Sequence, residues 1–180
     1  MSDTAKTRLA PDYFPLRPGL KWTYRHTSTE FEGVETVEVV IDRVRTSGRE
    51  TRARATLTRT RKGRLVKSLS YGIRKTPDEV FSEGGVLGLA RKEFPLPAAM
   101  GSTWMEAPDR HVIASLDAAI DVPCGAYSGC LRVDTFMAEG DAGSATRYYA
   151  PGLGYVCEEY AGEAWSSRAQ LESFSSPEAT

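Results

Sequence analysis

Apolar and polar residues alternate along most of the chain, which is the pattern of strands with one dry and one wet face. Trp22, Tyr24 and His26 fall on one side of residues 22–27, while threonine and arginine fall on the other. The same period of two predicts strands throughout the sequence, with little helix. Further segments of this kind are residues 36–42, 52–59, 65–73, 130–136, 146–150, 153–160 and 169–174.

Residues 112–122 fit two patterns. Ile113, Leu116 and Ile120 match helical spacing, and the alanines of this segment favour a helix. The apolar positions nevertheless alternate without a miss over the whole range, and Pro123 begins a turn into the next apolar segment. We therefore predict a strand here as well.

The length of 180 residues suits one domain with a sizeable core. We expect a lead at residues 1–11, a single all-β domain over residues 12–174 and a loose polar tail at residues 175–180. The predicted fold is about ten antiparallel strands in a curved sheet, either a sandwich or a half-open barrel.

One short pattern occurs twice. FPLRPGLKW (14–22) and FPLPAAMGSTW (94–104) both contain Phe-Pro-Leu followed by Gly-x-x-Trp, about half the chain apart. Proline disfavours a helix, glycine permits a tight reversal, and tryptophan can anchor the following strand in the core. The repeat predicts two related half-sheets, although chance convergence remains an open alternative because the rest of each half does not align.

The segment YYAPGLGYVCEEY (148–160) predicts a hairpin, because Pro151 and Gly152 occupy the two central positions of a type II turn. Simple alternation would then place Tyr155, Cys157 and Glu159 on one face. Neighbouring glutamates on such a strand point to opposite sides, so they cannot act as a catalytic carboxylate pair.

Charge is unevenly distributed although the net charge is only −1. Residues 43–75 contain twelve lysines and arginines but a single acid, Glu50. One hypothesis is an interaction module that binds an anionic partner through this region. A solvated strand face explains the same pattern, and no stacking aromatics interrupt the run, so we expect no nucleic-acid partner. The candidate anion-binding residues are Arg52, Arg54, Arg61 and Arg64.

Few residues are suited to metal binding or catalysis. The three cysteines lack zinc-ligand or redox spacing, and with only two histidines we expect neither a metal site nor a cofactor. The nucleophile pattern Gly-x-Ser-x-Gly is absent, and neither His26 nor His111 has an evident catalytic partner. We name no catalytic residue, and a hydrolase ranks third among the functions considered.

The first residues, MSDTAKTRLAPDYF, contain neither an apolar stretch nor a small-residue cleavage site that would direct secretion. The apolar runs elsewhere are too short to cross a bilayer. We therefore expect a cytoplasmic protein without a transmembrane segment. A cell-envelope location is the alternative if the natural chain begins upstream of Met1.

Three motifs occur in a fixed order: DYFPLRPGLKWTYR (12–25), VPCGAYSGCLRV (122–133) and RYYAPGLGYVCEEY (147–160). Together they resemble a family of little-characterised, β-rich bacterial proteins, many of them lipoproteins or secreted proteins. Cys130 falls on the cysteine position of the family's middle motif, whereas Cys124 replaces a residue that is more often small. The resemblance implies a β-rich fold and brings no catalytic residue.

Large aromatic residues are frequent on the predicted strands, and this surplus suggests a binding surface. Our leading hypothesis is a non-enzymatic binding module with a concave sheet face. The occupant would be an apolar or amphipathic ligand, such as a lipid-like small molecule, or a segment of a partner protein. The residues assigned to this face are Trp22, Tyr24, Leu69, Tyr71 and Tyr148.

Overall fold

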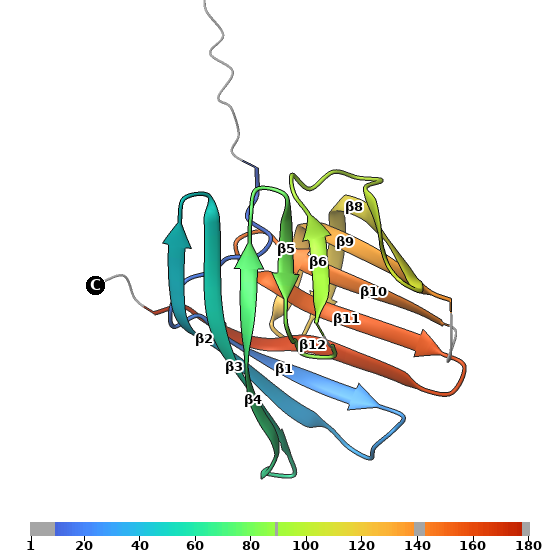
Figure 1. Ribbon diagram of the computed structural model, residues 1–180. Coiled ribbons are helices and arrows are strands. Elements are labelled where there is room, and N and C mark those ends of the chain that lie inside the picture. The colour runs from blue at the N-terminus through green and yellow to red at the C-terminus, as the bar shows by residue number, and fades with distance from the viewer. Residues whose placement is uncertain (1–9, 89, 139–142, 178–180) are drawn as a thin grey trace, which may run out of the picture.

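The protein is described by a computed structural model, which places residues 10–88, 90–138 and 143–177. All regular elements among these residues are strands, which form one antiparallel sheet of twelve (Figure 1). No described segment is a helix able to cross a bilayer. The strands are β1 (Lys21–Ser28), β2 (Glu35–Ser47), β3 (Glu50–Arg61), β4 (Arg64–Lys75), β5 (Glu79–Ser82), β6 (Arg91–Pro95), β7 (Thr103–Glu106), β8 (Asp109–Val122), β9 (Gly125–Met137), β10 (Gly143–Ala150), β11 (Gly154–Gly162) and β12 (Ser166–Ser175).

The sheet consists of two six-stranded meanders, β1–β6 and β7–β12, joined by the pairing of β1 with β12. Its two edges are β6 and β7, which are consecutive in the chain. The sheet curls until these edges meet, and there the Lys92 amide donates a hydrogen bond to Glu106 Oε1 at 2.7 Å. We call this junction the seam. The predicted all-β antiparallel fold is confirmed; of the two forms expected, a sandwich or a half-open barrel, the sheet takes the barrel-like one and is nearly closed, and residues 109–122 form a strand.

Both meanders begin with the same hydrogen-bonded reversal. The Gly19 amide donates to the Ile41 carbonyl, and the Gly101 amide donates to the Ile113 carbonyl, both at 2.8 Å. In each half the isoleucine amide donates back to the residue after the glycine at 2.9 Å. The two repeated sequences therefore build equivalent strand starts, each followed by a buried tryptophan (Trp22 and Trp104).

A glycine is required at these reversals because the backbone is left-handed there. Gly101 has φ +84°, and an added Cβ would meet nothing within 4 Å. Replacing Gly101 with alanine should therefore cost only the conformational strain, about 1–2 kcal/mol in the free energy of unfolding measured with urea. Gly85→Ala is the matched control, since that position also has open space but no left-handed φ. Equal losses in both variants would contradict this explanation.

A β-bulge changes which side chains of β11 face the interior. In the β10–β11 hairpin Tyr149 pairs with Tyr155 while Tyr148 pairs with Cys157, so one extra residue lies on β11. This bulge places Tyr155 on the same side as Glu158, contrary to our expectation that Tyr155 would share a face with Cys157 and Glu159. The predicted turn itself is present, with the Leu153 amide donating to the Ala150 carbonyl at 3.2 Å.

Candidate functional site

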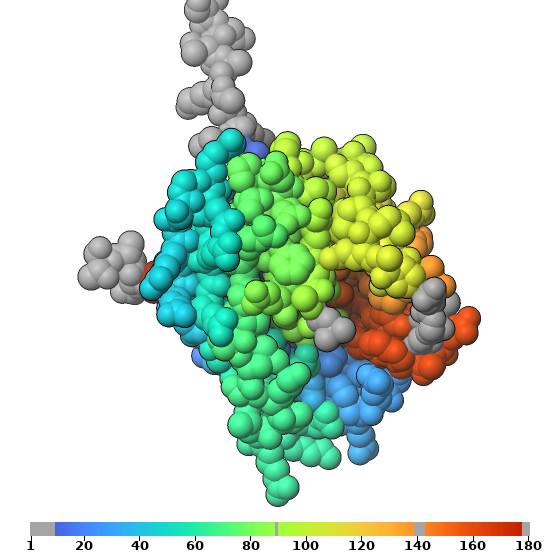
Figure 2. All heavy atoms as spheres, in the orientation of Figure 1, coloured from blue at the N-terminus to red at the C-terminus, as the bar shows by residue number. Residues whose placement is uncertain are grey.

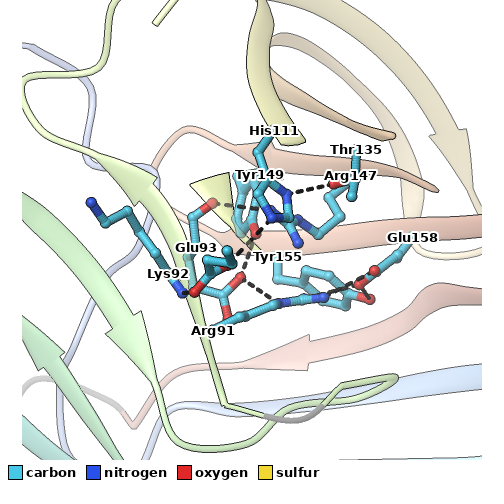
Figure 3. Close-up of polar contacts among 10 residues, drawn as sticks. Arg91, Lys92, Glu93, His111, Thr135, Arg147, Tyr149, Tyr155 and Glu158 are labelled. Carbon is cyan, nitrogen blue, oxygen red and sulfur yellow. Dashed lines mark hydrogen bonds and ion pairs between the residues drawn. The ribbon is translucent and has the colours of Figure 1, made fainter. Parts of the chain in front are cut away.

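A buried charged network lies behind the seam (Figure 3). Arg91 on β6 forms a two-pronged ion pair with Glu158 on β11, with both N–O distances at 2.9 Å. The Arg91 Nε also donates to Glu93 at 3.2 Å. Two tyrosine hydroxyls complete the network, from Tyr155 to Glu158 at 2.8 Å and from Tyr149 to Glu93 at 2.5 Å. The network therefore links the edge strand β6 to the opposite half of the barrel.

The charges of this network stabilise one another. Burial alone would raise the pKa of Glu158, but the attraction of Arg91 and Arg147 outweighs it and holds that pKa below its ordinary value. Hydrogen bonds from Arg91 and Tyr155 act in the same direction. Glu158 is consequently a carboxylate at neutral pH, and it depends on its partners because an isolated buried charge is costly.

Arg147 is the least satisfied charge in this region. It lies on β10 between Ala145 and Tyr149 on the inward face and is 2 % exposed. Among the described residues it makes one hydrogen bond, from Nη2 to the Glu93 carbonyl at 3.3 Å, and its Nε has no partner there. No carboxylate among the described residues lies within ion-pair distance of it. A buried guanidinium with most of its donors unused can bind an acidic group in two-pronged fashion.

His111 on β8 lies beside Arg147 and is equally enclosed. Its Nδ1 is 2.8 Å from the Thr135 hydroxyl, and its ring stacks on Trp104 with 5.0 Å between centroids. Its Nε2 lies 3.4 Å from Glu106 without a well-formed hydrogen bond. Burial and the positive charge of Arg147 lower the pKa of His111 to about 4, so the imidazole is neutral at physiological pH.

A cleft of about 970 Å³ lies beside the seam, and its lining includes Arg91, His111, Arg147 and Glu158. In Figure 2 the red and orange surface of the C-terminal strands is set back next to the yellow segment around β7, where the cleft opens. One part of its wall is charged or polar, and includes Arg91, His111 and Arg147. The other part is apolar and includes Leu87, Met137, Tyr160 and Trp165.

Three of the predicted aromatic ligand residues surround the centre of the barrel. Trp22, Tyr24 and Tyr71 are buried and line a void of only about 50 Å³, room for a few water molecules. Their polar atoms are used internally: Trp22 donates to the Leu153 carbonyl at 2.8 Å and Tyr24 to the Tyr155 carbonyl at 2.9 Å. A lipid-sized molecule would have to displace the core to occupy this position.

The other two predicted ligand residues lie apart from that void. Leu69 pairs across strands with Leu57 and packs half-buried against the core. Tyr148 pairs with Arg132 and faces the opposite side of the sheet from Tyr149. The five proposed residues therefore do not form one surface.

The predicted anion-binding arginines also divide between two faces. Arg52 and Arg54 are exposed on the outer face of β3. Arg61 turns the other way and binds Glu35 at 2.6 Å, with its guanidinium over the Phe31 ring. Arg64 is exposed at the start of β4.

Glu35 anchors a second buried group on β1–β3. Its carboxylate also contacts His26 at 3.0 Å and Arg59 at 3.1 Å, and Arg59 donates in addition to the Val86 carbonyl. Burial, opposed by the hydrogen bond to Glu35, lowers the pKa of His26. With its carboxylate saturated by three partners, this group resembles a structural cross-link more than a binding site.

Sequence reasoning did not single out Arg147, Arg91 or Glu158. Arg147 was detectable, because strict alternation places it inward between Ala145 and Tyr149 on an otherwise apolar face. Glu158 was set aside as one of two adjacent acids, and its partner Arg91 lies 67 residues away. The side-chain contact between β11 and β6 across the interior is a tertiary contact that alternation cannot predict.

Comparison with known proteins identifies the fold. No family model and no curated protein sequence matches the chain. Among solved structures, a candidate exported protein with a YmcC-like fold from Bacteroides fragilis NCTC 9343 has a TM-score of 0.71 at 15 % identity, covering 92 % of this chain and 100 % of that one. A candidate lipoprotein from Parabacteroides distasonis ATCC 8503 has a TM-score of 0.65 at 15 % identity, covering 93 % and 100 %. The chain shares their all-β architecture.

The expected cytoplasmic location is wrong in the light of these structures. Both neighbours with this fold are described as exported protein or lipoprotein. The expectation depended only on the polar character of the first residues of the sequence, which says nothing about a leader that could precede them.

Proposed function

We propose that the protein is a non-enzymatic binding module whose cleft beside the seam takes an amphipathic small molecule with an acidic head group. The observation that carries this proposal is Arg147, a nearly fully buried cation with a single hydrogen bond to the part of the chain that the structure describes. Buried guanidinium donors are normally hydrogen-bonded, and among the described residues Arg147 reaches no carboxylate within ion-pair distance, so its free donors suggest a ligand that supplies an acidic group.

The rest of the cleft supports a ligand with two unlike ends. Tyr160 and Trp165 stack with 3.9 Å between ring centroids and form part of the apolar wall, together with Leu87 and Met137. Such a wall favours an alkyl or aromatic body, while Arg147 favours a carboxylate, phosphate or sulfate head. A cleft of this size accommodates a drug-sized molecule.

The contacts favour binding over hydrolysis. Across the described residues, neither histidine hydrogen-bonds a serine or cysteine that could act as a nucleophile. The hydroxyl bonded to His111 belongs to Thr135, which is buried. Cys130 and Cys157 are fully buried, and burial raises the pKa of Cys157 to about 11, which keeps this thiol protonated and unreactive.

The proposal is tested with dodecanoate and its neutral analogue 1-dodecanol, using calorimetric titration. We expect dodecanoate to bind and the alcohol to bind at least about tenfold more weakly, because a charge-assisted hydrogen bond is lost. Arg147→Gln should reduce dodecanoate affinity by a similar factor. Arg132→Gln is the matched control, since Arg132 lies on the neighbouring strand but pairs with Asp134 on the outer face. Equal affinities for the acid and the alcohol, or an unaffected Arg147 variant, would refute the proposal.

We include a cell-envelope location in the proposal. The two neighbouring folds described as exported protein or lipoprotein support it. Buried, protonated thiols at Cys130 and Cys157 are compatible with an oxidising compartment. Fractionation of the native cells with immunodetection tests the location, and recovery of the protein only with cytoplasmic markers would contradict it.

A further inference from the structure

Five arginines gather on the outer face of β2, β3 and β4 around a hollow of about 430 Å³. We call this the arginine basin. It lies away from the cleft, and no residue lines both. Its members are Arg43 and Arg45 on β2, Arg52 and Arg54 on β3, and Arg74 on β4.

A β-bulge brings two of these arginines to the outer face. Ile41 of β2 pairs with Ala55 and faces the core, and simple alternation would turn Arg43 inward as well. The register instead skips Asp42, so that Arg43 pairs with the outward-facing Arg54. The Asp42 carboxylate accepts a hydrogen bond from the Thr56 hydroxyl at 2.7 Å, which holds the bulge in place.

The strand register sets like charges directly opposite one another. Arg43 faces Arg54, Arg45 faces Arg52, and Arg52 faces Arg74. Directly opposed like charges destabilise a sheet. Three consecutive pairs of this kind are not expected from a face that only needs to be soluble, because alternating signs would serve that purpose better.

The nearby acids compensate only part of the basin's charge, because five arginines face the carboxylates of Glu50, Glu79 and Glu83. Arg52 pairs with Glu50 and Arg74 with Glu79. Glu83 also lines the basin and keeps its negative charge while its carboxylate accepts the Gly72 amide at 2.9 Å. In the described part of the chain, Arg43, Arg45 and Arg54 have no ion pair. Phe81 is the basin's one aromatic ring and lies under the Arg74 guanidinium, 5.9 Å from the ring centroid.

We propose that the arginine basin is a second binding site, for an anion that presents two or more phosphate or sulfate groups close together. The reason is the regular spacing of these arginines: their Cβ atoms recur about 5 Å apart across strands and about 7 Å apart along them, and each carries a long cationic side chain. A single small anion can contact only part of that array, whereas a linear or clustered polyanion can contact several arginines at once. With its single ring occupied, the basin offers no platform for stacking nucleobases.

Inorganic tripolyphosphate is the probe, titrated calorimetrically against the intact protein at low salt with orthophosphate for comparison. We expect tripolyphosphate to bind at least about tenfold more tightly than orthophosphate, and its affinity to fall steeply as salt is added. The double variant Arg43→Gln/Arg54→Gln should lose at least about tenfold in tripolyphosphate affinity. The control Arg64→Gln/Lys67→Gln removes the same charge from exposed positions near the β3–β4 turn.

Equal losses in both double variants would show that only net charge matters and would overturn the proposal. Equal binding of tripolyphosphate and orthophosphate by the unaltered protein would overturn it as well. The variants also test the opposition of like charges, because removing Arg43 and Arg54 should raise the unfolding temperature by about 1–4 °C. A fall in that temperature would contradict the claim that the register is strained.

The phosphate groups could belong to a soluble molecule or to lipid head groups. Co-sedimentation with phosphatidylcholine vesicles, with and without phosphatidylglycerol, distinguishes these sources. Binding only to the anionic vesicles, lost in Arg43→Gln/Arg54→Gln, assigns the basin to lipid phosphates. Tripolyphosphate binding without vesicle binding assigns it to a soluble polyanion.

Discussion

Replacing Glu158 with alanine is expected to lower the free energy of unfolding by about 3–5 kcal/mol, measured by urea denaturation at neutral pH. Glu158 is 5 % exposed and holds both terminal nitrogens of Arg91 at 2.9 Å. Without it, Arg91 keeps its charge in the interior, with only Glu93 beside it. The Tyr155 hydroxyl would lose its acceptor in the same variant.

The adjacent acid provides the control. Glu159 pairs with Arg168 at 2.8 Å, but both side chains are nearly half exposed. Glu159→Ala should therefore cost less than about 1 kcal/mol. Similar losses at the two positions would mean that the buried network contributes no more than a surface ion pair.

A double variant distinguishes the cost of an unpaired buried charge from the cost of lost packing. Replacing both partners, Arg91→Met with Glu158→Leu, removes one cation and one anion together and keeps comparable volume, while Glu93 loses Arg91 but keeps the hydrogen bond from the Tyr149 hydroxyl. We expect this double variant to be more stable than Glu158→Ala alone, because an apolar pair avoids the desolvation of two charges. A double variant as unstable as Glu158→Ala would show that the network's geometry, and not its unpaired charge, determines stability.

The alternation of apolar and polar residues predicted the all-β fold, because the two faces of a strand are set by the residues of that strand alone. Residues 52–59 alternate cleanly, and the strand, its faces and its antiparallel partner follow from that pattern. The short strands β5, β6 and β7 span only four or five residues, too few for a period of two to stand out. The nine strand segments named from the sequence and these three short strands together make the twelve observed, and two of the three, β6 and β7, form the seam.

Because of β-bulges, the alternation of apolar and polar residues did not predict correctly which site residues face the interior. The extra residue in β11 reverses the side chains after Tyr155, and the one in β2 turns Arg43 outward. Each bulge changes the face of every following residue on its strand, so a single unrecognised insertion misplaces a whole set of candidates. In both cases the shift supplies a member of a proposed site: Glu158 behind the cleft and Arg43 in the arginine basin.

The two proposed sites differ in the physical origin of their unpaired charge. Arg147 is deeply buried, so the low polarity around it strengthens the attraction to one acidic group. The basin's arginines lie at the surface and attract an anion jointly, so their attraction is screened by salt. High salt should therefore weaken tripolyphosphate binding much more than dodecanoate binding, and this difference allows the two sites to be measured independently in one protein.

Acidification from pH 6.5 to about 4.5 is expected to destabilise the protein, largely through His111. Its pKa in the folded protein is lowered to about 4, whereas an unfolded histidine titrates near 6.5. Between these values the unfolded chain binds a proton that the folded protein does not, so stability is present at higher pH and is lost as the pH falls. The full difference amounts to about 3 kcal/mol for this residue.

Urea denaturation at pH 7, 6, 5.5 and 4.5 measures this effect. His111→Gln should have a lower free energy of unfolding at pH 7, because the stacking on Trp104 is lost, but a shallower dependence on pH across the window. His26 also has a lowered pKa and contributes with the same sign, so His26→Gln should remove a further part of the slope. Carboxylates such as Glu158, whose pKa is lowered, act mainly below this window, since unfolded glutamate titrates near 4.3. An unchanged slope in His111→Gln would show that the pKa of His111 is the same in the folded and unfolded chains, and the electrostatic description of the cleft would then be wrong.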